Sequence, residues 1–149
     1  MNDTSRLGSI ALLAARFLMA AIFMFAGYGK LAAYHQTEVY MQNAGLPDFL
    51  LPLVILTELG GGLALILGWQ VRIAALLLGG FSILTGLLFH TNFSDANQTL
   101  NFLKNIAMAG GFLALFVSGA GAYSLDMPRR WTERPPWPPG RRSTTSLMD

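Results

Sequence analysis

The chain alternates long apolar segments with short polar ones, and this pattern predicts four helices. Each apolar segment is close to the roughly 20 residues that a helix needs to cross the hydrocarbon core of a membrane. None of them carries the wide polar face of an amphipathic helix in a soluble protein. We therefore expect an all-α, integral membrane four-helix bundle, with helices at about residues 7–27, 49–68, 73–89 and 102–122.

The polar connections between these helices predict different local structures. The longest, residues 28–48, contains YHQTEVYMQNAGLP, which predicts a short helix at the membrane surface that the Gly and the Pro end. The sequence WQVR at residues 69–72 predicts a tight turn, and the polar residues 90–101 predict a loop with a turn at Asp95.

The first apolar segment follows Arg6, as a secretory signal would follow a basic residue. However, Arg16 interrupts it, and the sequence GYGKLAAY after it is a poor cleavage region. These features favour a helix that stays in the membrane over a signal peptide.

The composition changes after Asp126 to the Arg- and Pro-rich sequence MPRRWTERPPWPPGRRSTTSLMD. Such a segment cannot bury a core, and PPWPP favours an extended polyproline II conformation. We expect residues 1–126 to form one transmembrane domain and residues 127–149 a flexible cytoplasmic tail. The tail would lie at the anionic lipid surface or serve as the ligand of a partner protein.

Composition supports lipid as the solvent of the folded chain. Of 149 residues, 53% are hydrophobic and only 12% are charged, whereas soluble domains are about a quarter charged. The absence of cysteine excludes a disulfide, a thiol redox step and a thiolate metal site in this chain. No phosphate-binding loop, Ser–His–Asp arrangement or basic stripe for nucleic acid is present.

The distribution of basic residues predicts the orientation. Positions 129–149 hold five of the ten basic residues, and Arg6 and Arg72 fall on the same side of a four-span bundle. Because short loops rich in Lys and Arg remain in the cytoplasm, we expect both termini there.

Glu58 lies at the centre of the apolar run LVILTELGGGLALILG, where a charged side chain is costly. Arg16 enters the membrane from the opposite side, so we expect a structural ion pair between Arg16 and Glu58, with Lys30 or Lys104 as alternative partners. Glu58 is equally a candidate for a proton-exchanging, catalytic or ligand-facing carboxylate. Gly62 lies on the same helix face and allows a neighbouring helix or a flat ligand to approach.

Lys30, His90 and Lys104 lie at the ends of three different helices on one side of the bundle. Snorkelling of long cations to the membrane surface explains each lysine separately. Together with His90 they also suit the polar headgroup of a quinone. The only other histidine is His35, and neither histidine has a partner at ligand spacing, so no metal or haem site is predicted.

Five segments of the sequence resemble those of a known family: ARFLMAAIFMFAGYGK, YMQNAGLPDFLLPLVILTELGGGLALILGWQVRIAAL, LLFHTNF, NFLKNIAMAGGFLAL and GAGAYSLD. In order and spacing they resemble the DoxX family, most closely its small four-helix bacterial inner-membrane members, over about residues 7–126. The resemblance places the motif positions of the family at Gly29, Lys30, Glu58, Arg72, His90, Lys104 and Asn105. We expect a ligand-binding set of Lys30, Glu58, Gly62, His90, Lys104 and Asn105.

The resemblance also implies a range of functions. Family members are associated with quinone-linked oxidation, including subunits of thiosulfate:quinone oxidoreductase, and with membrane complexes that counter oxidative or thiol stress. We expect an accessory or quinone-interacting subunit of a membrane oxidoreductase in the inner membrane. The alternatives are a non-catalytic scaffold for other membrane proteins and, less favoured, a small-solute carrier, which four helices could form only as a homo-oligomer.

Overall fold

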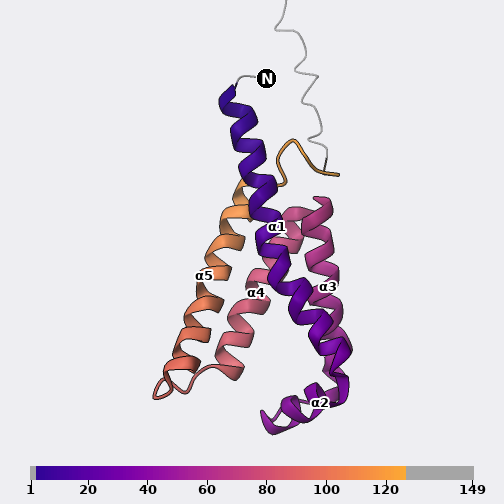
Figure 1. Ribbon diagram of the computed structural model, residues 1–149, viewed down its shortest axis with the longest axis vertical. Coiled ribbons are helices and arrows are strands. Elements are labelled where there is room, and N and C mark those ends of the chain that lie inside the picture. The colour runs from indigo at the N-terminus through magenta and orange to yellow at the C-terminus, as the bar shows by residue number, and fades with distance from the viewer. Residues whose placement is uncertain (1–2, 127–149) are drawn as a thin grey trace, which may run out of the picture.

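The computed structural model of the chain describes residues 3–126, and within that range every regular element is a helix (Figure 1). Four of its helices are long and apolar enough to cross a membrane: α1 (Asp3–Ala32), α3 (Leu51–Leu67), α4 (Val71–Phe89) and α5 (Ala96–Ser118). The short helix α2 (Tyr34–Asn43) and the 3-10 turn η1 (Asp48–Leu50) connect α1 to α3. The predicted all-α class with four membrane helices is confirmed. The predicted tail, 127–149, lies outside the described residues.

The long helices pack as two pairs, α1 with α3 and α4 with α5, and α3 also packs on α4. Figure 1 shows the beginning of α1 and the segment after α5 at one end of the bundle, with α2 at the other. At the α2 end, α1 and α5 diverge from each other. An even number of spans places both ends of the described chain on one side.

Helices α1 and α5 differ most from the predicted bounds: α1 begins four residues earlier and ends five residues later than the expected 7–27, and both ends of α5 are shifted for local reasons. Helix α5 begins six residues early, at Ala96, because the Asp95 side chain accepts a hydrogen bond from the Asn97 N–H at 2.8 Å and caps the helix. It ends at Ser118, because Gly119 takes a left-handed φ of 75°. Between α3 and α4, Gly68 has a φ of 68°, and an added Cβ would meet Ser124 and Arg16. Only glycine fits this turn.

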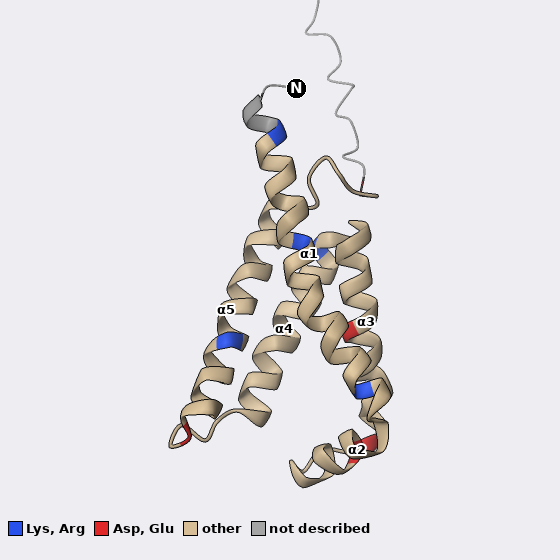
Figure 2. Cartoon of the chain, in the orientation of Figure 1, with Lys and Arg blue, Asp and Glu red and all other residues tan. Residues whose placement is uncertain are grey.

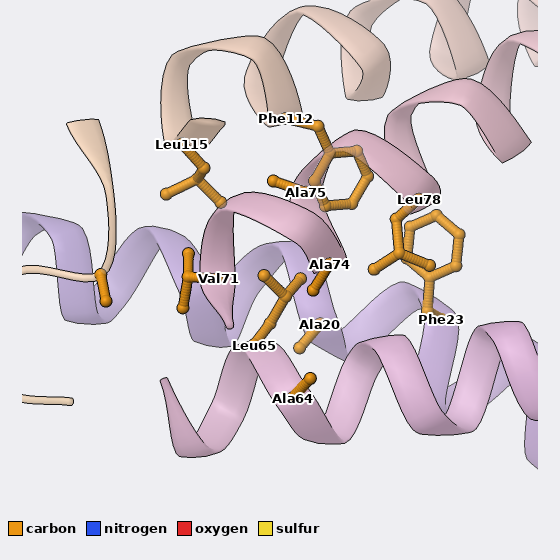
Figure 3. Packing of buried hydrophobic residues seen from close by; sticks show 11 residues of the cluster. Ala20, Phe23, Ala64, Leu65, Val71, Ala74, Ala75, Leu78, Phe112 and Leu115 are labelled. Carbon is orange, nitrogen blue, oxygen red and sulfur yellow. The ribbon is translucent and has the colours of Figure 1, made fainter. Parts of the chain in front are cut away.

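The core is built from alanine, branched aliphatic and phenylalanine side chains (Figure 3). The Phe23 ring of α1 lies 5.4 Å from Phe112 of α5, and Leu78 of α4 packs beside them. Large apolar side chains such as Phe25 and Leu18 are exposed instead of buried. Exposure of this kind suits a bundle whose outer surface is solvated by lipid tails.

Candidate functional site

A cavity of about 290 Å³ lies between the helices at the α2 end of the bundle. All five α-helices contribute to its wall. Most of the lining is apolar or aromatic, with a few polar groups among it, which is the usual character of a small-molecule site. The polar and aromatic lining residues are Lys30, Thr37, Glu58, Thr85, His90, Asn105, Phe23, Tyr40, Phe81 and Phe89.

An ion pair between Lys30 and Glu58 forms one polar side of the cavity. The Lys30 Nζ donates to both carboxylate oxygens of Glu58, at 2.8 and 2.9 Å. The Glu58 side chain is only 5% exposed, and that of Lys30 is 29% exposed. Lys30 lies in the last turn of α1, where the helix dipole also favours a cation. The pair therefore joins α1 to α3 and puts both signs of charge beside the cavity.

In the structure, Glu58 does not pair with Arg16, which was the expected partner. Its guanidinium donates to two backbone carbonyls in the segment after α5, those of Ala120 at 2.5 Å and Tyr123 at 2.6 Å. The residue is 1% exposed, and its bonds to the segment after α5 direct it away from the α2 end, where the cavity lies. Arginine has several donors in a planar fork, so its two terminal nitrogens each reach a carbonyl where a single carboxylate was expected. Its Nε is buried and has no hydrogen-bond partner among the described residues. Figure 2 shows that the helices carry few charged residues besides Arg16, Lys30 and Glu58.

His90 and Asn105 line the cavity from the α4 and α5 side. His90 is the C-cap of α4, and its Nδ1 lies 2.7 Å from the Oε1 of Gln98. The Asn105 side chain donates to the Asn101 carbonyl at 3.0 Å and accepts from the Thr85 hydroxyl at 3.2 Å. Both side chains are therefore held in place by neighbours before any ligand binds.

Two residues of the expected ligand set lie elsewhere. Lys104 is exposed, and its Nζ donates a hydrogen bond to the Asn101 side chain at 3.5 Å. It precedes Asn105 by one residue, which turns it about 100° around α5 and away from the cavity. Gly62 packs against Met24 and Ala20 of α1, where an added Cβ would lie 2.9 Å from the Met24 sulfur. It serves helix packing.

Sequence reasoning missed the aromatic wall of the cavity. Phe81, Thr85 and Phe89 recur every four residues along α4, so they share one helix face, and this spacing is visible in the sequence. The Phe89 ring stacks on Tyr40 of α2 at 5.3 Å, with 16° between the ring planes. That contact needs α2 to fold back over the bundle, for which the sequence has no signal.

A second polar cluster lies at the opposite end of the bundle. The carboxylate of Asp126 accepts hydrogen bonds from the Gln70 and Val71 N–H groups, at 2.7 and 2.8 Å, and so caps the N-terminus of α4. The Asp126 N–H donates to the Gly68 carbonyl at 2.7 Å. Together with Arg16, these bonds tie residues 119–126 to α1 and to the turn between α3 and α4.

The cavity can hold a small, flat, largely apolar molecule with hydrogen-bonding oxygens. Aromatic rings provide surfaces for stacking. Lys30 and Asn105 carry donors, while Glu58 and the second ring nitrogen of His90 can exchange protons. Among residues 3–126, no three His, Asp or Glu side chains converge in a way that could hold a metal ion.

Comparison with known proteins agrees with the resemblance in the sequence. The profile of the DoxX family matches residues 11–91, which include Lys30, Glu58 and His90. The inner membrane protein YqjF of Escherichia coli (strain K12) is 46% identical over 128 residues, which are 85% of this chain and 98% of that protein. The inner membrane protein YphA of the same strain is 32% identical over 97 residues, 60% of this chain and 69% of that protein. No solved structure matches.

Proposed function

This chain belongs to the DoxX family and is a multi-pass inner-membrane protein, and we propose that it binds a quinone or quinol headgroup in the cavity beside Lys30 and Glu58. The observation that carries the proposal is a cavity of about 290 Å³ that combines aromatic walls with a buried ion pair. This volume is at the lower end of the range for ligand sites, so it suits one substituted ring.

Each chemical feature of a quinone has a counterpart in the lining. A quinone carbonyl accepts hydrogen bonds, and the Lys30 ammonium and the Asn105 amide are donors on different sides of the cavity. The flat ring suits the faces of Phe81 and Phe89. A quinol, by contrast, donates hydrogen bonds, for which Glu58 and His90 are acceptors. The same lining can thus hold both redox forms.

The role that fits best is that of an accessory subunit of a membrane oxidoreductase. The chain has no cysteine, so it cannot itself perform a thiol–disulfide step. We assign the electron transfer to a partner protein and the binding of the quinone to this chain. In this proposal both termini face the cytoplasm, as the arginine distribution favours, so the cavity lies in the periplasmic half of the membrane.

The proposal is tested by titrating a short-chain ubiquinone analogue against the purified protein. His90→Phe and Asn105→Leu each remove a hydrogen-bonding group from the cavity and keep the Lys30–Glu58 pair. We expect each to weaken binding about tenfold, the usual worth of a lost hydrogen bond in a buried site. The double variant Lys30→Met/His90→Phe should abolish measurable binding.

Lys104→Met is the matched control, because it removes a lysine from the same end of the bundle but outside the cavity. It should bind like the wild type. Equal binding by all variants, or no binding to the folded wild type, would refute the quinone site. The alternative function, a non-catalytic scaffold for other membrane proteins, would then be favoured.

A further inference from the structure

The cavity lies between α1 and α5 on the flank where these helices part. Towards the middle of the bundle the two helices touch: Phe23 meets Phe112, and an added Cβ at Gly111 would lie 3.0 Å from Met19. Beyond Phe23, towards α2, they diverge (Figure 1). There the cavity is lined by Ala26 and Lys30 from α1 and by Asn105 and Met108 from α5, and Ile22, which adjoins Phe23, lines its inner end.

On the α1 side of this flank, the helix presents small or apolar side chains that leave the gap open. Ile22, Ala26 and Lys30 recur every four residues, so they form one stripe about 12 Å long on the helix. Ile22 lines the cavity and is 47% exposed, so no neighbouring side chain covers it completely. Ala26 has only a methyl group with which to close the gap. Because α1 spans the membrane, this exposure is to lipid tails and not to water.

The end of the cavity that faces the membrane surface is covered instead. Thr37, Tyr40 and Met41 of α2 form this end. Met41 is 4% exposed and packs against Leu51 and Ile55 of α3, while Tyr40 stacks on Phe89 of α4. Helix α2 is thereby fixed at both of its sides to the long helices. A molecule in water would have to displace these contacts, whereas one in the bilayer would not.

The charge of the lining agrees with a ligand that dissolves in lipid. Lys30 and Glu58 neutralise each other at 2.8 Å, so the pair offers no net charge to an anion or a cation. An anionic ligand would also face the Glu58 carboxylate. A neutral headgroup with acceptor oxygens avoids that repulsion and still gains the Lys30 and Asn105 donors.

We propose that the ligand of this cavity enters sideways from the bilayer between α1 and α5, and that its apolar chain stays in the gap at Ile22 and Met108 while its head lies beside Lys30. The inference rests on the proposed function, because it takes the cavity as the binding site. It narrows the ligand class to neutral, membrane-dissolved molecules that carry a hydrocarbon tail.

The test uses the full chain in lipid nanodiscs and a ubiquinone analogue with a decyl tail that carries a photoreactive diazirine. After illumination, mass spectrometry locates the cross-links. We expect them near Ile22 on α1 and near Met108 on α5, and we expect an excess of the analogue without diazirine to remove them. Ile22→Trp, which fills the gap with a larger side chain, should lower the cross-linking yield about tenfold.

Leu18→Trp is the matched control, because Leu18 lies one turn away on the exposed face of α1 and outside the cavity. It should leave the yield unchanged. Competed cross-links at Tyr40 and Met41 would overturn the sideways route and leave quinone binding intact. Cross-links at Ile22 that no quinone competes away would mean that a lipid tail fills the gap, which also overturns it. A complete lack of quinone binding in the titration would defeat the proposed function itself.

Discussion

Glu58 meets a single basic side chain among residues 3–126, and one lysine nitrogen serves both of its oxygens. The two partners differ in their surroundings, since Glu58 is nearly inaccessible and Lys30 is partly exposed at the end of α1. Without Glu58, the Lys30 side chain can turn towards the headgroup region, as long cations do near helix ends. Glu58 has no such alternative, because it lies in the middle of α3.

Breaking the pair should therefore cost unequal amounts. Lys30→Met leaves the Glu58 carboxylate buried without a partner, and we expect a loss of about 3–5 kcal/mol in the free energy of unfolding. Glu58→Met should cost clearly less, and the double variant should cost less than the sum of the two. Denaturant titration of the four proteins in detergent gives this double-mutant cycle, with Lys104→Met as an inert comparison. Strict additivity would show that the two side chains do not interact.

Arg16 poses a different problem, because its acceptors are backbone carbonyls. A lysine at this position keeps the charge but has one nitrogen in place of the two that reach Ala120 and Tyr123. We expect Arg16→Lys to lower the melting temperature in detergent almost as much as Arg16→Met does. If the lysine variant melts at the same temperature as the wild type, the positive charge alone explains how Arg16 stabilises the protein. The planar geometry of the guanidinium would then not contribute.

Among the elements, α4 has the least usual N-terminus. Its N-cap residue, Gln70, has a left-handed φ of 49° and makes no side-chain cap. The capping carboxylate comes instead from Asp126, 55 residues further along the chain. Asp126 also interacts electrostatically with Arg16. One acidic residue thus holds together the start of α4 and the segment after α5.

Asp126→Ala should therefore destabilise the protein by about 1 kcal/mol, the usual cost of a lost N-cap, or somewhat more because Arg16 loses a counter-charge. Hydrogen exchange should speed up at the Gln70 and Val71 amides, which donate to Asp126. Asp95→Ala, which removes the local cap of α5, should leave those two amides protected. Faster exchange at Val71 in both variants would point to a general loosening.

At the scale of the helices, much of the structure could be predicted from the sequence. Hydropathy located the four long helices, because lipid exposure demands a continuous apolar surface. It placed the start of α5 too late, because residues 96–101 are polar and only the Asp95 cap reveals that they are helical. Polarity pointed to Lys30, Glu58 and His90, and the family resemblance to Asn105. The sequence favoured Arg16 over Lys30 as the partner of Glu58, whereas the structure pairs Glu58 with Lys30. That choice depends on residues 119–126, whose contacts are long-range.

For the whole molecule, the proposed orientation places both ends of the described chain in the cytoplasm. The absence of native cysteine makes single-cysteine labelling of intact cells direct. We expect a membrane-impermeant maleimide to label Asn43→Cys and Ser94→Cys from outside and to leave Trp69→Cys unlabelled until the cells are opened. All three positions are exposed in the structure. The reverse pattern would move the cavity, with its lysine, to the cytoplasmic half of the membrane.

The bonds of Arg16 also determine when the protein can finish folding. A ribosome makes Arg16 104 residues before Ala120, so at 5–20 residues per second α1 waits about 5–20 s for its acceptor. During that time the Arg16 guanidinium has no acceptor, although its helix is being inserted into the bilayer, where an unpaired charge is costly. We expect chains truncated after Ser118 to be degraded in cells and chains truncated after Asp126 to accumulate. The first helix to be synthesised thus depends on contacts with residues near the end of the described chain.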